Sequence, residues 1–223
     1  YNMLQIRDVK VSAHVKCIAT AEEVKTKSVE ELDALLDESF SFDNFAWQRD
    51  NKISIDVPFR ADGLHRILYK CPNCGAESQM EGKGIHLTCH VCNKKWTMDE
   101  YGQLAANEGV TEYPHIPDWN KWQRECVRQE LENGTYMLDT DVDIAIQVNL
   151  NGVCKIGKGH LTHSLDGFHL VGAEGKLDYS QSPTFSHTLY SDYYWYEMGD
   201  IIGIGDNEFS YFCFPKNNVS VTK

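Results

Sequence analysis

The sequence predicts an α+β fold in which a zinc ribbon flanked by helices is followed by an antiparallel β barrel or sandwich. Three observations lead to this prediction. Two Cys-x-x-Cys pairs lie 14 residues apart in the first half of the 223-residue chain. Apolar residues recur at helical spacing on both sides of them, and beyond residue 135 the apolar spacing changes to two. With 42% apolar residues, the chain can fill real cores.

We divide the chain into four regions: residues 1–66, the zinc ribbon at 67–98, a helical connector at 99–134 and a β domain at 135–223. The near-alternation of apolar residues in 1–20 predicts one or two strands. Ser28-Val-Glu-Glu31 is a capping box, and the apolar stripe behind it predicts a helix to about Glu38. The four aromatic residues that follow favour a docking surface inside the protein over a ligand site: Phe40, Phe42, Phe45 and Trp47.

The connector predicts two helices. Thr97-Met-Asp-Glu100 is a second capping box, and we expect it to open a short helix that stops near Gly109. Pro114 and Pro117 then exclude helix locally. Asp118 is expected to cap the next helix, and Asn133-Gly134 to end it. The apolar face between them is made by Trp119, Trp122, Cys126 and Leu131.

The β domain is predicted from alternation and turns. Residues 142–150 alternate apolar with mostly polar side chains, as in a strand with one buried face, and Asn151-Gly152 is a hairpin signal. Short apolar runs follow near 153–156, 159–163, 168–172, 175–180, 185–196, 200–204 and 208–214. Seven or eight strands punctuated this often are typical of an antiparallel barrel or sandwich.

The paired cysteines have the spacing of a four-cysteine zinc ribbon: Cys71, Cys74, Cys89 and Cys92. Two cysteines separated by two residues point at one tetrahedral metal. Gly75 and Asn93, each directly after a knuckle, tolerate the left-handed backbone that such knuckles need. Two disulfides or a redox pair are the alternatives.

Four thiolates close the coordination shell, so the expected role of Zn²⁺ is structural rather than catalytic. His86 and His90 lie nearby as replacement ligands, but the four cysteines already suffice. The remaining four cysteines are scattered singly, which favours a reducing, cytoplasmic setting.

Charge excludes two classes of partner. Against 33 Asp and Glu the chain has 21 Lys and Arg, a net charge of −12, which disfavours nucleic acid and anionic membrane surfaces. Residues 60–98 hold six basic and three acidic residues, and a zinc with four thiolates reduces that balance to about +1. Residues 135–223 stand at −6. We therefore expect no nucleic-acid partner and no headgroup binding by electrostatics alone.

The stretch Phe59-Arg-Ala-Asp-Gly-Leu-His-Arg-Ile-Leu-Tyr-Lys-Cys-Pro-Asn-Cys74 resembles the C-terminal region of bacterial 1-acylglycerol-3-phosphate (lysophospholipid) acyltransferase-like proteins. In these, a catalytic domain is followed by a zinc ribbon and a β-rich tail. Residues 28–33, 111–119 with the helix after it, and 159–170 are also similar, so the likeness covers most of 28–215.

The resemblance implies a parent enzyme of phospholipid synthesis at the cytoplasmic membrane face. Residues 1–20 would be the closing strands of its catalytic domain, and the chain, which starts at Tyr1, a piece of it. The partners implied are the chain's own upstream catalytic domain and a membrane lipid or protein.

The chemistry of this family needs a His-x4-Asp pair, and one pair fits the spacing, His187 with Asp192. With nine histidines in so acidic a chain, one chance pair is expected. A strand spacing of five puts the two side chains on opposite faces, and the family's motif would lie upstream of the ribbon. We therefore expect no catalytic residue in this chain.

The β domain resembles a pleckstrin-homology-like barrel around residues 157–170 and 201–214, without the helix that ends such barrels. Its aromatic run places rings on both faces of one strand, and the candidate surface for a ligand or partner is Tyr190, Tyr194 and Tyr196. An alternative function is therefore a ligand-binding module for carbohydrate or peptide. The histidines of this domain are expected to be ordinary strand residues rather than metal ligands: His160, His163 and His169.

Overall fold

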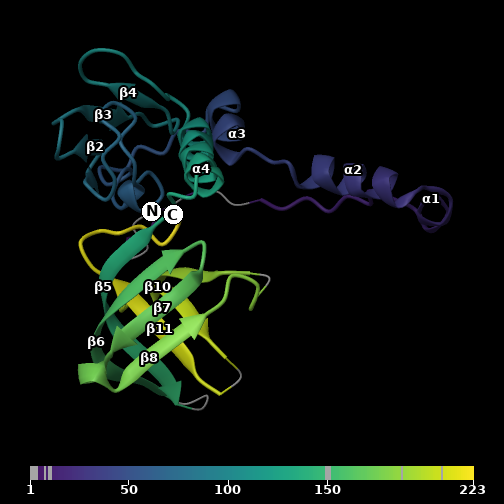
Figure 1. Ribbon diagram of the computed structural model, residues 1–223. Helices are drawn as coiled ribbons and strands as arrows, with labels where there is room; N and C mark the ends of the chain where they lie inside the picture. Colours follow the sequence, from purple (N-terminus) through teal and green to yellow (C-terminus); the bar gives the residue numbers. More distant parts are fainter. Residues whose placement is uncertain (1–4, 8, 10–11, 149–151, 187, 207) are drawn as a thin grey trace.

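The structure is a computed structural model that describes residues 5–7, 9, 12–148, 152–186, 188–206 and 208–223. It confirms the α+β class and comprises an N-terminal arm, a four-stranded antiparallel sheet beside a long helix, and a seven-stranded antiparallel sheet (Figure 1). Each sheet has its own apolar core.

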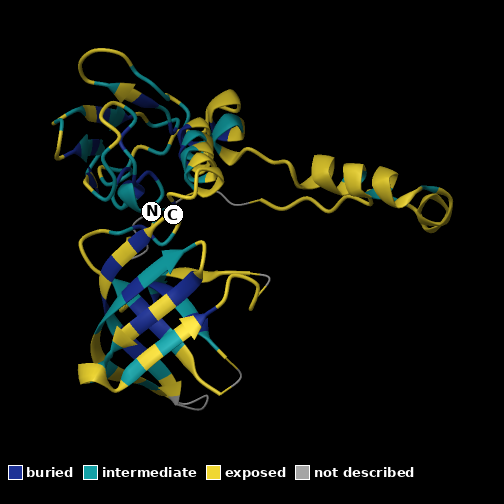
Figure 2. Ribbon diagram, viewed as in Figure 1, coloured by how far each residue is buried: buried dark blue, intermediate teal, exposed yellow. Residues whose placement is uncertain are grey.

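The arm runs outward from the body as extended chain and returns through α1 (Ala21–Thr26) and α2 (Val29–Phe40) to α3 (Asn44–Asp50) (Figure 1). Capping boxes at Thr20 and Ser28 begin the first two helices, so the helix predicted at Ser28 is confirmed and runs two residues beyond Glu38. No residue of α1 or α2 is buried, and Figure 2 shows the arm exposed along its length.

Two predictions for the arm are wrong. The described part of residues 1–20 forms no strand. Alternation of apolar residues makes a strand only where a neighbouring strand completes the backbone ladder. The aromatic cluster is not internal as a whole. Phe45 packs against the core of the four-stranded sheet, whereas Phe40 and Phe42 are 81% and 67% exposed.

The four-stranded sheet has the order β1-β2-β3-β4: Met80–Lys83, His86–Cys89, Lys95–Met98 and Leu104–Ala106. A 3₁₀ turn, η1 (Leu64–Arg66), precedes it. The helix predicted from Thr97 is wrong, because Trp96 and Met98 are buried on one face of β3 while the Thr97 hydroxyl donates to Asn107 Oδ1. The alternation of buried and exposed side chains in this segment therefore favours a strand, in spite of the helix-capping signature at Thr97.

The helix α4 (Ile116–Glu132) covers this sheet. It begins at an N-cap of His115 rather than Asp118, because Pro117 in the first turn has no N–H to lose and its fixed φ suits a helix. Pro117 therefore does not exclude helix, contrary to the prediction. Asn133 caps the C-terminus and Gly134 follows at φ +70, as predicted.

The seven-stranded sheet has the order β8-β7-β6-β5-β11-β10-β9, with every neighbouring pair antiparallel. In chain order its strands are Leu138–Val148, Gly152–Ser164, Gly167–Gly172, Leu177–Gln181, Tyr190–Trp195, Gly199–Gly205 and Ser210–Pro215. A 3₁₀ turn, η3 (Ala173–Gly175), joins β7 to β8.

The strand prediction for this region is confirmed, with two runs merged into the single long strand β6. The hairpin predicted at Asn151 lies outside the described residues, although β5 and β6 pair on either side of it. The sheet is not a closed barrel among the described residues, since β8 and β9 each have one neighbour. The sheet is strongly curved. Gln181 at the end of β8 accepts a hydrogen bond at 3.0 Å from the backbone N–H of Gly205 in β10, and this contact requires the two sides of the sheet to approach each other.

Residues 220–223 join the two sheets. Ser220 donates from its hydroxyl to the carbonyl of Arg66 at 2.6 Å. Lys223 forms ion pairs with Glu77 at 2.6 Å and Glu130 at 3.2 Å, and Lys70 completes a four-membered cluster with the same two carboxylates. These four side chains are 13–25% exposed, so their charges are only partly screened by water.

Gly82 in β1 is expected to tolerate no side chain. A Cβ there would lie 2.4 Å from the carbonyl oxygen of Ala61 and 2.8 Å from the backbone nitrogen of Leu64, and neither atom can move alone. Gly82→Ala should lower the free energy of unfolding by about 1–3 kcal/mol. Gly152→Ala, whose Cβ meets open space, is the matched control. Equal denaturant midpoints for the two variants would contradict this assignment.

The ion-pair cluster predicts an acid-sensitive junction. Although burial raises the pKa of Glu77, hydrogen bonds and charges from Lys223 and Lys70 outweigh it and hold the pKa below its ordinary value. The folded pKa is therefore below the unfolded one, so this stabilisation is present above the unfolded pKa and is lost as pH falls through the folded pKa. Glu77→Gln should lower the free energy of unfolding by about 1–3 kcal/mol near neutral pH. This difference from wild type should shrink towards zero in acid.

Urea unfolding of wild type and Glu77→Gln between pH 7 and pH 3 would measure this. The exposed Glu108→Gln controls for the loss of one negative charge. A cost that stays constant across this range would show that Glu77 acts by packing and not by its charge.

Candidate functional site

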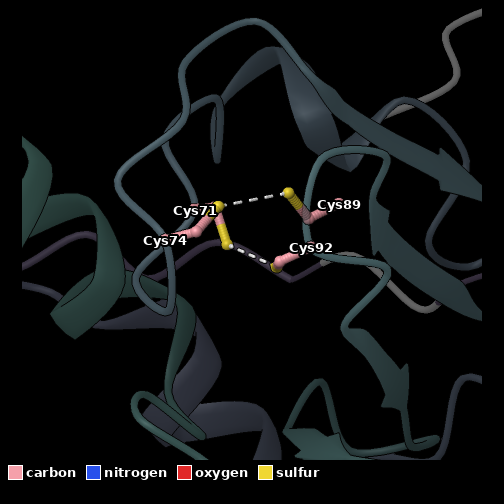
Figure 3. A group of neighbouring side chains, drawn as sticks. All are labelled: Cys71, Cys74, Cys89 and Cys92. Atoms are coloured by element: carbon pink, nitrogen blue, oxygen red, sulfur yellow. Dashed lines mark hydrogen bonds between the residues drawn. The ribbon is translucent and has the colours of Figure 1, made fainter.

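The structure brings the four predicted cysteines together (Figure 3). Cys71 and Cys74 lie in the loop between η1 and β1, Cys89 ends β2, and Cys92 lies in the turn before β3. The four sulfur atoms all lie within 4.8 Å of one another. This group could hold a metal ion, and it is the group of that kind found among the described residues.

The sulfur separations argue against disulfides. Cys71 Sγ lies 3.7 Å from Cys92 Sγ, and Cys74 Sγ lies 3.7 Å from Cys89 Sγ. A disulfide bond is about 2.05 Å long. All eight cysteines are free thiols in this structure, and each short contact joins one knuckle to the other. The sulfurs therefore surround a common centre.

Local backbone geometry builds each knuckle. Gly75 at φ +75 and Asn93 at φ +59 adopt the left-handed conformation that the sequence predicted for them. The N–H of Gly75 donates to the carbonyl of Cys71 at 2.9 Å, which closes the first knuckle. The N–H of Cys89 donates to the carbonyl of Lys94, also at 2.9 Å, which closes the second.

A second layer of contacts from α4 fixes the chain just before Cys71. The side-chain carbonyl of Gln123 accepts from the backbone N–H of Lys70 at 3.0 Å, and its amide donates to the carbonyl of Ile67 at 2.8 Å. Trp119 donates from its indole N–H to the carbonyl of Lys70 at 3.0 Å. Gln123 is 1% exposed and Trp119 is fully buried. Nothing in the sequence marks Gln123 for this role, since a lone polar residue on an apolar helix face gives no such signal.

The electrostatics of the thiols differ. Burial raises the pKa of Cys71 and of Cys89, in spite of hydrogen bonds from backbone N–H groups. At Cys92 desolvation also opposes ionisation, but the backbone N–H of Lys94, the side chain of Asn73 and the neighbouring thiols outweigh it and lower the pKa to about 7. Binding of a metal would therefore displace protons from the two buried thiols.

Neither histidine near the knuckles belongs to this group. His86 forms a hydrogen bond through Nδ1 with the Thr97 hydroxyl at 3.0 Å. The ring of His90 is exposed, with Nε2 3.2 Å from a carboxylate oxygen of Glu81.

The three tyrosines predicted to form one ligand or partner surface lie in two different places. Tyr190 and Tyr196 line a groove of about 490 Å³ together with Gln181, Trp195 and Phe212. Tyr194 does not line it. Its ring lies beneath the guanidinium of Arg66, with the Cζ atom 3.7 Å from the ring centroid. Gln181 and Phe212 could not be predicted from the sequence, because the strand order places them beside tyrosines that are distant in sequence.

The remaining histidines are placed as strand residues. His160 lies 3.0 Å from carboxylate oxygens of Asp139 and Asp141, and the hydrogen bond that its ring donates to Asp141 raises its pKa. His163 contacts the Tyr136 hydroxyl, and burial lowers its pKa. His169 lies 2.8 Å from Asp178. His187 of the rejected catalytic pair lies outside the described residues.

Comparison with protein-family models, with curated proteins and with solved structures gave no significant match. Fold and site together define an α+β protein with a group of four cysteines suited to a metal ion. In the described part of the chain, no helix combines the length and apolar character needed to cross a membrane.

Removing one ligand should unfold the four-stranded sheet. Cys89 is fully buried in its core, so Cys89→Ser deprives both the metal group and the core of a sulfur, and we expect a loss of about 2–5 kcal/mol with loss of bound metal. Cys154→Ser, at an exposed cysteine of the other sheet, should change neither. Metal analysis and thermal unfolding measure both quantities, and full metal content in Cys89→Ser would refute the assignment.

Proposed function

We propose that the four cysteines bind Zn²⁺ and that the zinc is structural. In a tetrahedral site with Zn–S bonds of about 2.3 Å, neighbouring sulfurs are about 3.8 Å apart. Here Cys71 Sγ and Cys92 Sγ are 3.7 Å apart, as are Cys74 Sγ and Cys89 Sγ. Four thiolates leave no open position for water or substrate, and two of them are fully buried, which supports a role in folding rather than in chemistry.

We further propose that the chain is the non-catalytic accessory region of a bacterial 1-acylglycerol-3-phosphate acyltransferase of phospholipid synthesis, working in the cytoplasm. The family is proposed because several separate segments resemble it in the same order along the chain. The structural observation that supports an accessory role is the arm, in which α2 exposes an apolar face with no partner among the described residues. Val29 and Leu36 on this face are 68% and 41% exposed.

The partner of that face is then the upstream catalytic domain. A helix of five acidic and no basic residues would not approach an anionic lipid surface unaided, so direct docking of α2 on a membrane is disfavoured. The seven-stranded sheet is separate from the arm and remains available for a lipid or protein partner (Figure 1).

Assaying the chain alone for acyl transfer to lysophosphatidic acid tests the accessory role. We expect no turnover above the uncatalysed rate, because the His-x4-Asp chemistry of the family is not supplied here. Turnover that disappears in His187→Ala would refute this proposal.

Docking is tested by adding the chain to an isolated catalytic domain of the resembled family. Binding should weaken at least about tenfold in Leu36→Asp, since a buried charge replaces an apolar contact. Val110→Asp, at a 74% exposed valine outside the arm, should bind as wild type does. Equal binding by the two variants would exclude α2 as the docking element.

A further inference from the structure

We infer that the groove beside β9 and β10 binds the pyranose rings of a neutral oligosaccharide. The aromatic floor of the groove lies on the face of the seven-stranded sheet opposite its main apolar cluster, whereas Ile204 of that cluster and Gln181, which pairs with Phe168, line the groove from the cluster's side. Ile202, Cys213 and Ile144 face that cluster, and they pair directly across three strands. The next row, Gly203 and Phe212, points to the other side, where the floor of the groove lies.

An aromatic platform forms the floor of the groove. Tyr190, Gly203 and Phe212 lie side by side in one row across β9, β10 and β11. A Cβ on Gly203 would lie 2.3 Å from the Tyr190 ring, so the absence of a side chain lets this ring lie against the β10 backbone. Trp195 stacks on Phe212 with ring centroids 4.1 Å apart. Tyr190 is still 47% exposed and offers a ring surface to solvent.

The turn between β9 and β10 holds a second ring out beside this floor. Tyr196 and Glu197 adopt φ of +45 and +61, values that bulky residues rarely take. Such backbone strain persists where the surrounding structure imposes it, often at binding sites. The Tyr196 ring is 70% exposed and stands edge-on to Trp195 at 4.7 Å. The strained backbone of this turn thus holds the Tyr196 ring exposed to solvent.

A buried amide supplies polar recognition. Gln181 is 6% exposed, and its Oε1 accepts from the Gly205 N–H at 3.0 Å and from the Tyr179 hydroxyl at 3.3 Å. Because the N–H of Gly205 can only donate, these contacts identify the carbonyl end of the side chain. Both of these hydrogen bonds use Oε1, and Gln181 lines the groove, so its amide N–H groups are the donors that it can offer to a ligand oxygen.

Charge and strand geometry select the class of ligand. Among the described residues that line the groove, Asp206 is the charged one and no Lys or Arg is present, which disfavours an anion. Addition of a peptide strand to β9 is disfavoured too. The backbone N–H groups of Tyr193 and Tyr194 already donate to the carboxylates of Asp192 and Asp200.

A neutral ligand with flat apolar faces and a rim of hydroxyl groups fits what remains. A pyranose ring has C–H groups on its faces for stacking on tyrosine and hydroxyl oxygens to accept from an amide. Two exposed tyrosines, on the floor and beside it, suit at least two linked rings.

Saturation-transfer NMR with maltose, cellobiose, lactose and N,N′-diacetylchitobiose at millimolar concentration tests the inference. At least one disaccharide should receive saturation on its ring protons. Tyr190→Ala and Tyr196→Ala should each weaken its binding about tenfold or more, and Tyr190→Phe, which keeps the ring, should retain it. Phe209→Ala is the matched control, at a 52% exposed aromatic residue in the turn between β10 and β11 that does not line the groove.

Unchanged thermal unfolding of the tyrosine variants would show that lost binding is not lost folding. An alternating Thr-Val peptide, added in the same way, should give no signal that depends on Tyr190 or Tyr196. The inference is overturned if none of the four disaccharides binds, if both alanine variants bind as wild type does, or if the peptide binds in their place.

Discussion

The side chain of Gln123 is the contact on which the candidate metal centre depends. From the buried face of α4 it pairs with the backbone of residues 67 and 70, as a neighbouring strand would, and Trp119 adds a third bond one turn away. The segment that enters Cys71 pairs with residues 76–78 on one side and is held by α4 as well. In an apolar interior each of these bonds would leave an unsatisfied backbone group if broken, so they fix position as well as adding stability.

The same helix also reaches the junction. Glu130, near the C-terminal end of α4, forms ion pairs with Lys70 and Lys223. The helix therefore contacts both the ribbon and residues 220–223. On the other side of η1, Arg66 lies over the Tyr194 ring and pairs with Asp200 at 3.4 Å. The relative placement of the two sheets is thus set by charged groups that are mostly shielded from water, not by a shared apolar core.

Sequence reasoning predicted the parts whose signal is local. The spacing of the four cysteines, the left-handed residues Gly75 and Asn93, and the alternation in β5 depend on neighbours a few residues away. It failed where two local signals competed, as at Thr97, whose capping pattern lost to burial of Trp96 and Met98. Contacts that depend on the strand order could not be predicted, since Gln181 and Gly205 are brought together only when the sheet curves.

Residues 220–223 have a consequence for the order of folding during synthesis. Their partners Arg66 and Glu77 lie 146 or more positions earlier in the chain. The ribbon, with α4 and all its strands before residue 133, is complete in sequence before the first strand of the second sheet is made. Because earlier segments fold first as the chain is made, the ribbon forms before the second sheet, and the contacts of residues 220–223 form after both. A chain stalled before residue 220 would hold its two sheets together through the contacts of Arg66 with Tyr194 and Asp200, without those of Ser220 and Lys223.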